Sequence, residues 1–273
     1  MASLNGARVA LLEARMSNEL ASLVERAGGT PYTVPAVREV PLTHPPEASA
    51  FIEQLCARRF DYVVLMTGVG VTALLREAER DGRLDEVLAA LRNTTTVCRG
   101  PKPAAVLKRH DVPVRVSAPE PHTATELLAA LLPMAVAGKR IGLLHYGERN
   151  DAVGDALKAR NADVEDLCLY EWQLPDEVGG LERLVDDLVG ARVDAIAFTS
   201  QIQVRHLFAI AERRGRVPAL VEALNRQVIV AAVGPVCASA LRSVGVIPHV
   251  QPAHPKMGPM VLALADYLEL TGR

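Results

Sequence analysis

The chain has 273 residues, of which 49% are hydrophobic and 23% are charged, so it is long enough for two domains and too apolar to be disordered. A formal net charge of -2 and an aromatic content of 4% provide neither a field that attracts nucleic acid nor rings that stack bases. No apolar run approaches the roughly 20 residues that span a bilayer, and the first residues lack the basic and apolar regions of a signal peptide. We therefore expect a cytoplasmic protein without a nucleic-acid or membrane partner.

Predicted strands and helices alternate along the chain. Short apolar runs without polar alternation are typical of strands covered by helices on both faces. These runs occupy residues 8–12, 32–37, 60–67, a run ending at Cys98, 112–116, 140–144, 164–170, 193–200, a run ending at Val233, and 246–250. Amphipathic helices are predicted at residues 18–27, 71–80, 123–132, 152–160 and 204–213. This alternation predicts an α/β fold with parallel sheets and right-handed crossovers.

Three segments of the first half recur in the second half at nearly constant spacing. Arg8–Leu12 matches Arg140–Leu144, 132 residues later (140 − 8). An Asp that precedes an apolar run and then hydroxyl residues occurs at Asp61 and again at Asp194, 133 residues later (194 − 61). A Gly-Pro pair begins at Gly100 and again at Gly234, 134 residues later (234 − 100). Three matches in register indicate a duplicated unit. Each half is therefore expected to be a doubly wound, flavodoxin-like sheet.

Two proline-containing stretches look like connectors. Residues 38–46 cannot form regular helix because of their prolines, and residues 171–176 lie at the equivalent place in the second copy. A tandem arrangement would place the domain boundary near residues 137–138. The prolines favour a chain that crosses between the domains at both connectors instead.

In open parallel sheets, ligands bind beyond the carboxyl ends of the strands. This rule selects six loops, which begin near Glu13, Thr67, Arg99, His145, Thr199 and Gly234. Helix N-termini at such loops favour carboxylates or phosphates, so we expect a small anionic ligand. The candidate substrate-binding residues are Thr67, Gly68, Arg99, Gly100, Lys102, His145, Tyr146, Arg149, Thr199, Ser200, Gln201, Gly234, Pro235 and Cys237.

Each candidate also has a purely structural interpretation. The hydroxyl residues at 67, 199 and 200 are typical helix N-caps, and the cations Arg99 and Lys102 can be solvated. The polar loop at residues 145–149 can equally hold a ligand or face water. Cys237 at a helix N-terminus could have a lowered thiol pKa or simply be a small packed residue.

Two cofactor classes are disfavoured. The G-x-G-x-x-A sequence at residues 68–73 resembles a dinucleotide fingerprint, but it does not follow the first strand, and its repeat partner at residues 201–203 has no glycine. The histidines have no H-x-x-x-H spacing, and the four cysteines are far apart, which predicts reduced thiols without a metal.

Over its whole length the chain resembles the uroporphyrinogen-III synthase family. The resemblance rests on Phe198-Thr199-Ser200, on Ala232-Val233-Gly234-Pro235, on the strand end at Tyr170 and on the order of the six strand-helix units. It implies two flavodoxin-like domains with interleaved connectivity, joined by a two-stranded linker. The implied domains are residues 1–37 with 177–273, and residues 47–170, with linkers at 38–46 and 171–176.

The resemblance also implies a reaction. Hydroxymethylbilane, a linear tetrapyrrole, loses water and closes with inversion of its last ring, without a cofactor or metal. A tyrosine at the position of Tyr170 is the family's usual candidate for the proton donor. The family often has hydroxyl residues where this chain has Pro103 and Cys237, so a non-catalytic relative that binds a tetrapyrrole or another anion remains the alternative. We expect a monomer.

Overall fold

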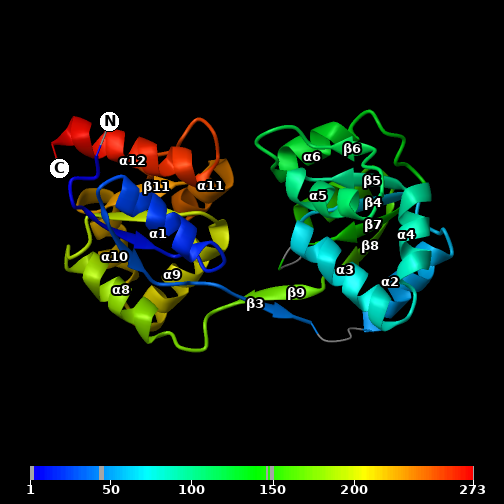
Figure 1. Cartoon of the computed structure of the whole chain (residues 1–273), viewed down its shortest axis with the longest axis horizontal. Coiled ribbons are helices and arrows are strands. Elements are labelled where there is room, and N and C mark those ends of the chain that lie inside the picture. Colours follow the sequence, from blue (N-terminus) through cyan, green and yellow to red (C-terminus); the bar gives the residue numbers. More distant parts are fainter. Residues whose placement is uncertain (1–2, 43–45, 146, 148–150, 273) are drawn as a thin grey trace. The chain divides into compact units, whose positions relative to one another are not determined.

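The structure is a computed structural model that describes residues 3–42, 46–145, 147 and 151–272. The chain forms two compact units: unit 1 contains Met1–Arg38 and Gln173–Arg273, and unit 2 contains Glu39–Trp172. In each unit, helices cover both faces of a parallel sheet (Figure 1). The predicted fold class is therefore confirmed: the fold is α/β, and the chain leaves unit 1 after its first strands and later returns to complete it.

Unit 1 contains a four-stranded parallel sheet in the order β11-β10-β1-β2. Its strands are β1 (Arg8–Leu11), β2 (Thr30–Thr33), β10 (Ala195–Phe198) and β11 (Ile229–Ala232). Its helices are α1 (Ser17–Arg26), α8 (Gly179–Val189), α9 (Gln201–Arg213), α10 (Val217–Arg226), α11 (Pro235–Ser243) and α12 (Met257–Thr271). Successive strand residues enter opposite cores: Ala10 packs with α8 to α11, and Leu11 with α1 and α12. Both faces are thus buried, which explains the uninterrupted apolar strands.

Unit 2 contains a five-stranded parallel sheet in the order β6-β5-β4-β7-β8. Its strands are β4 (Tyr62–Leu65), β5 (Thr95–Cys98), β6 (Val116–Ser117), β7 (Arg140–Leu144) and β8 (Asp163–Leu167). Its helices are α2 (Pro46–Cys56), α3 (Gly68–Arg80), α4 (Leu84–Asn93), α5 (Pro101–Arg109), α6 (Ala124–Leu131) and α7 (Asp151–Lys158). The first four helices cover one face of the sheet, and α6 and α7 cover the other.

The duplicated segments occupy equivalent places in the two sheets. β1 and β10 are neighbours in unit 1, as their counterparts β7 and β4 are in unit 2. The repeated Asp makes the same contact in both: Asp194 Oδ2 accepts from the backbone N of Arg8 at 2.7 Å, and Asp61 Oδ2 accepts from that of Arg140 at 2.9 Å. Each unit therefore combines the first strands of one copy with the later strands of the other.

A two-stranded sheet of β3 (Arg38–Pro41) and β9 (Tyr170–Gln173) connects the units along the chain. The prediction that Tyr170 ends a strand over residues 164–170 is wrong. β8 ends at Leu167, and Tyr170 begins β9, because the Leu169 carbonyl accepts from the backbone N of Leu42 at 3.0 Å and the chain changes partner there.

Two other predicted strands are shorter than expected. Of residues 112–116 only Val116 lies in a strand, and of residues 246–250 only Val250 makes a bridge, to Ala231. Each segment contains a proline, which cannot donate to a neighbouring strand. Among the described residues, no helix has the length and apolar character needed to cross a membrane.

Candidate functional site

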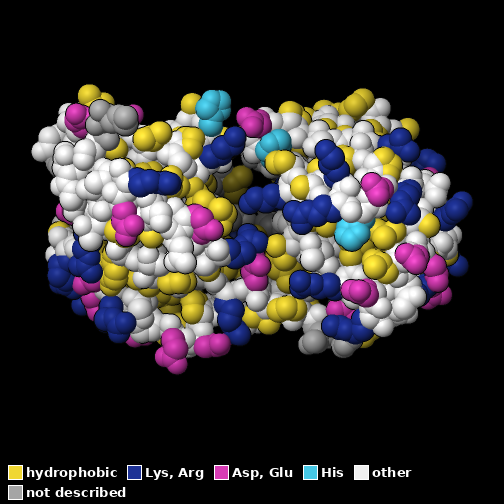
Figure 2. Space-filling view, viewed as in Figure 1, with side chains coloured by type: hydrophobic (Ala, Val, Ile, Leu, Met, Phe, Trp, Pro, Cys, Tyr) yellow, Lys and Arg dark blue, Asp and Glu magenta, His cyan; other side chains and the backbone are white. Residues whose placement is uncertain are grey.

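The carboxyl ends of the parallel strands gather the predicted residues into two groups, one in each unit. In unit 2, β4, β5 and β7 lead into Thr67, Arg99 and His145. In unit 1, β1, β10 and β11 lead into the segments that contain Glu13, Thr199 and Gly234. On the face shown in Figure 2, basic and acidic side chains are interspersed over each unit, in keeping with the small net charge.

Tyr170 and Thr67 form the clearest polar contact in unit 2. The Tyr170 side chain is 3% exposed, and its hydroxyl lies 2.9 Å from Thr67 Oγ1, with either oxygen able to donate. Thr67 is also the N-cap of α3 and accepts from the backbone N of Gly70 at 3.0 Å. The Trp172 ring packs edge-on against the Tyr170 ring at 6.2 Å between centroids. The capping interpretation of Thr67 is therefore confirmed, and its place in a substrate site stays a prediction.

Two glycines of unit 2 lie where another segment of the chain approaches closely. A Cβ atom on Gly68 would lie 2.9 Å from the Lys102 carbonyl oxygen, and one on Gly100 would lie 3.0 Å from His122 Cβ. Close packing of α3 on α5 thus accounts for the first glycine of the G-x-G sequence without a nucleotide. Gly100 is the N-cap of α5, Arg99 is half-buried, and Lys102 is exposed at the start of that helix.

His145 is a buried residue that contacts a partly exposed network of charged side chains. Its side chain is 1% exposed, and its Nε2 lies 2.7 Å from Asp166 Oδ1. Lys158 Nζ lies 3.4 Å from the other oxygen of Asp166. Burial raises the pKa of Asp166, but the hydrogen bond from His145 and the charges of His145 and Lys158 outweigh it, so the pKa is lowered overall. His145 is therefore not a solvated loop residue, and Tyr146 and Arg149 lie outside the described residues.

Unit 1 has a polar network at the end of β10. The Thr199 hydroxyl donates to Glu13 Oε2, and it accepts from Gln203 Nε2 at 2.8 Å. Gln203 is 2% exposed, and its Oε1 accepts from the backbone N of Thr199 at 2.8 Å and from that of Ser200 at 3.3 Å. Ser200 is the N-cap of α9, and Gln201 is the half-buried first residue of that helix.

The start of α11 differs from the prediction at Cys237. Its side chain is 3% exposed, and its Sγ donates to the Phe198 carbonyl at 3.6 Å, inside the core. Burial raises the pKa of its thiol to about 12, the opposite of the shift expected at a helix N-terminus. The packed interpretation of Cys237 is therefore confirmed, and its contact with a substrate stays a prediction. Gly234 is buried, and a Cβ atom there would lie only 2.9 Å from Pro255 Cβ. Pro235 is exposed.

Two residues of these hydrogen-bond networks, Asp166 and Gln203, are not among the candidates that the sequence predicts. Asp166 lies in β8 among other acidic residues, and only its position opposite the end of β7 pairs it with His145. Gln203 stands where the first copy has a glycine, but its spacing of three residues from the Ser200 N-cap is the signature of a capping box, and this signal could have identified it.

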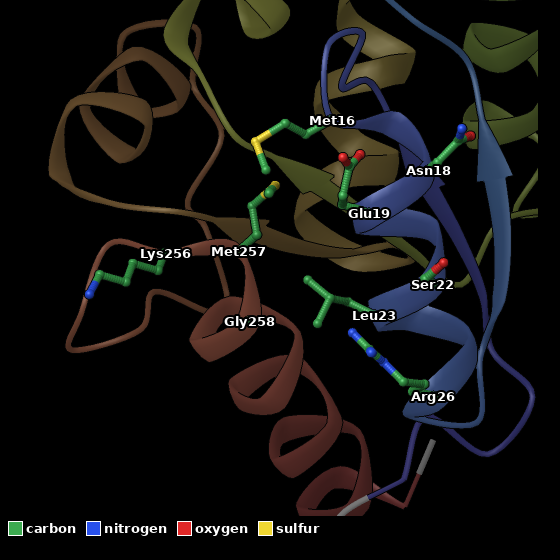
Figure 3. A pocket seen from close by; sticks show the side chains of 9 residues that line it. All are labelled: Met16, Asn18, Glu19, Ser22, Leu23, Arg26, Lys256, Met257 and Gly258. Carbon is green, nitrogen blue, oxygen red and sulfur yellow. The ribbon is translucent and has the colours of Figure 1, made fainter. Parts of the chain in front are cut away.

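A depression of about 660 Å³ in unit 1 contains none of the predicted site residues (Figure 3). Met16 and Leu23 face it from the beginning and middle of α1, and Met257 faces it from the start of α12. Among the residues that the structure describes, no group of His, Cys, Asp or Glu side chains could hold a metal ion. The four cysteines, which are all described, form no disulfide.

Comparison with known proteins identifies the family. Residues 18–261 match the family model described as uroporphyrinogen-III synthase HemD. The uncharacterized protein YjjA of Bacillus subtilis is 34% identical over 267 residues, 97% of each chain. A Methanothermobacter thermautotrophicus protein, provisionally named a uroporphyrinogen-III synthase, is 31% identical over 91% of this chain and 93% of its own length.

Solved structures agree with these sequence relatives. A mutant uroporphyrinogen III synthase of Thermus thermophilus has a TM-score of 0.74 and 30% identity, with 97% of this chain and 99% of the other covered. The Helicobacter pylori uroporphyrinogen-III synthetase shares the fold at a TM-score of 0.56 and 14% identity, with 98% of this chain and 100% of the other covered. The resemblance noted in the sequence is thus confirmed, and the chain belongs to the uroporphyrinogen-III synthase family.

Proposed function

We propose that this protein is a catalytically active uroporphyrinogen-III synthase, a carbon–oxygen lyase of tetrapyrrole biosynthesis. It would convert hydroxymethylbilane to uroporphyrinogen III, with loss of water and inversion of the last ring. Family membership supports the reaction class, and the observation that carries the proposal is the contact between the buried Tyr170 and the partly buried Thr67.

Loss of the substrate hydroxyl as water requires a proton. A phenol is a neutral acid near pH 7 and can supply one. Because the Thr67 oxygen already accepts from the backbone N of Gly70, its own hydrogen is available to the Tyr170 oxygen. In that arrangement Tyr170 donates its proton to the leaving hydroxyl, and Thr67 stabilises the oxygen left behind. Tyr170 is the catalytic residue of the proposal, and Thr67 positions it.

Binding must also control which isomer forms. Unaided ring closure gives the product without inversion, so the protein has to hold the chain of pyrroles in one conformation. The substrate carries eight carboxylates, and the cations Arg99 and Lys102 with the N-terminus of α5 are the proposed partners for some of them in unit 2. The proposal uses no cofactor or metal.

The test is an isomer analysis. Hydroxymethylbilane is generated in situ, the products are oxidised, and the type I and type III isomers are separated. We expect excess type III isomer with the wild-type protein and at least about a hundredfold lower rate with Tyr170→Phe, the lower end of the effect of removing a general acid. Only type I isomer from folded wild-type protein would contradict the proposal, and full activity of Tyr170→Phe would remove Tyr170 from it.

One observation favours a second candidate, a tetrapyrrole- or anion-binding relative without activity. At the two positions where the family often has hydroxyls, Pro103 and Cys237 are both buried and offer none. The same assay separates the candidates, since a purely binding protein would retain tetrapyrrole without producing excess type III isomer.

A further inference from the structure

The hydroxyl of Thr199 has its hydrogen committed within the protein. It donates to Glu13 Oε2 and accepts from Gln203 Nε2 at 2.8 Å. A hydroxyl has one hydrogen and two lone pairs, so what remains for a ligand is a single acceptor position. Thr199 is only partly buried, and we take this acceptor position to be the one that a ligand reaches.

Glu13 fixes this orientation. Its Oε1 accepts from the backbone N of Arg15 at 3.2 Å and of Met16 at 3.4 Å, which holds the carboxylate at the turn between β1 and α1. Within the described residues, no Lys or Arg side chain forms an ion pair with Glu13. A carboxylate cannot donate while it is ionised, so the Thr199 hydroxyl must supply the hydrogen of their contact.

Gln203 fixes the direction of the hydrogen bonds in this network. Its Oε1 accepts from the backbone N–H groups of Thr199 and Ser200, so its amide nitrogen is the atom that faces Thr199 and Glu13. The whole network therefore presents acceptors and negative charge at the end of β10. A ligand carboxylate would find no hydrogen to accept from Thr199 and would be repelled by Glu13.

We propose that Thr199, positioned by Glu13, accepts a hydrogen bond from a pyrrole N–H group of the tetrapyrrole rather than binding one of its carboxylates. This inference rests on the proposed function, because it takes the ligand to be a tetrapyrrole. It changes the role of Thr199 from the anion contact that its place beside a helix N-terminus suggests. Glu13 acts through Thr199 and is a positioning residue.

Two probes separate the possible roles of this network. Uroporphyrinogen III carries pyrrole N–H groups and eight carboxylates, whereas benzenehexacarboxylate carries carboxylates and no N–H group. Dissociation constants for both are measured by anaerobic isothermal titration calorimetry with the full-length protein. Thr199→Val removes the acceptor at nearly constant volume, and Thr199→Ser is its control because it keeps the hydroxyl.

We expect Thr199→Val to weaken uroporphyrinogen III binding about three- to tenfold, the value of one hydrogen bond, and to leave benzenehexacarboxylate binding unchanged. Equal weakening for both probes, or for neither, would overturn the inference. Thr199→Ser should bind both probes as the wild type does. Thermal unfolding of each variant establishes that the protein is folded.

Neutralising Glu13 gives a test of opposite sign. Both probes carry carboxylates and lose a repulsive charge in Glu13→Gln, but only uroporphyrinogen III also loses the oriented acceptor of Thr199. We expect that loss to outweigh the relief of repulsion, so this variant should bind uroporphyrinogen III more weakly and benzenehexacarboxylate more tightly. Glu19→Gln, which removes one charge from the first turn of α1, should not weaken either. Tighter binding of both probes to Glu13→Gln would show simple repulsion and contradict the inference.

Failure of the proposed function has a different signature. A wild-type protein that neither binds uroporphyrinogen III nor forms the type III isomer would remove both the function and the inference. An active wild-type protein whose Thr199→Val variant binds both probes normally would remove the inference alone. Glu13→Asp, which keeps the charge but shortens the side chain, replaces Glu13→Gln if that variant is unfolded and should weaken uroporphyrinogen III binding.

Discussion

At the scale of single residues, Thr67 combines two tasks in one oxygen. It accepts from the backbone N of Gly70 as an N-cap and lies 2.9 Å from the Tyr170 hydroxyl. We expect Thr67→Val to lower the rate of type III isomer formation by about tenfold or more, because a hydrogen bond to a developing charge is lost. The same change should cost about 0.5–2 kcal/mol of unfolding free energy through the lost cap.

The matched control is Thr67→Ser, which keeps the hydroxyl and should keep both properties. Rates are compared by single-turnover isomer analysis and stabilities by urea unfolding. A Thr67→Val variant that loses stability but keeps the wild-type rate would show that Thr67 is only a cap.

The carboxylate of Asp61 makes part of the unfolding free energy of unit 2 depend on pH in the acid range. The Lys139 ammonium, 2.9 Å away, and the backbone N of Arg140 lower the pKa of Asp61. A lowered folded-state pKa means that the ionised form stabilises the fold above the unfolded value of about 3.9, and that this contribution is lost as the pH falls through the folded value. The pair is partly exposed, so its contribution is at most about 1 kcal/mol.

Asp61→Asn should therefore be less stable than the wild type in urea unfolding at pH 7, and the difference should shrink at pH 3. Glu25→Gln, an exposed change on α1, serves as the control and should show no such pH dependence. A difference of the same size at both pH values would assign the effect to packing rather than to the charge.

At the scale of elements, the contact between α3 and α5 depends on a missing side chain. A Cβ on Gly68 would lie 2.9 Å from the backbone carbonyl oxygen of Lys102, which cannot move aside cheaply. We expect Gly68→Ala to destabilise the protein by about 1–3 kcal/mol, the usual cost of overpacking. Thermal unfolding measures the effect.

Gly258 is the matched control, because it also lies in the first turn of a helix, α12, and a Cβ there would meet nothing within 4 Å. Gly258→Ala should be neutral or up to about 1 kcal/mol stabilising, since alanine is the better helix former. Equal effects of the two changes would show that the approach of α3 to α5 is not what Gly68 provides.

The elements show where sequence reasoning succeeds and where it stops. The strand β10 is predictable from its sequence, because burial on both faces of the sheet requires an uninterrupted apolar run. The helix α9 is predictable from the helical spacing of its apolar residues. The prediction for Tyr170 is wrong because the backbone changes partner just before it. β8 pairs with β7, whereas the Leu169 carbonyl accepts from the backbone N of Leu42 and β9 pairs with β3. The ring of His145 and the carboxylate of Asp166 meet through strand register, which no local pattern encodes.

At the scale of the whole molecule, the duplication and the crossing connectors have one consequence. β1 lies between β10 and β2, so the central part of the unit 1 sheet comes from both ends of the chain. Unit 2 is continuous, from Glu39 to Trp172. The repeat was visible in the sequence, but the exchange of strands between its copies followed from the proline connectors and the family resemblance rather than from the strands themselves.

Isolated fragments of the two units should differ in whether they unfold cooperatively, because unit 2 is continuous in the chain and unit 1 is not. The fragment of residues 39–172 retains all five strands of its sheet and both of its cores, so we expect it to unfold cooperatively on its own. The fragment of residues 173–273 lacks β1, β2 and α1, and it leaves apolar residues of α12 such as Leu264 without their partners. We expect it to show no cooperative unfolding in circular dichroism.

A circular permutant tests whether residues 173–273 fail to fold because β1, β2 and α1 are missing or because their own sequence cannot fold. The order 173–273, a flexible Gly/Ser linker and then residues 1–38 restores β1 beside β10 in a single chain, and both ends to be joined belong to unit 1 (Figure 1). This permutant should recover cooperative unfolding, because the sheet order and both cores of unit 1 are complete again. If residues 173–273 unfolded cooperatively alone, the strands supplied from the other end of the chain would not be needed to hold unit 1 together.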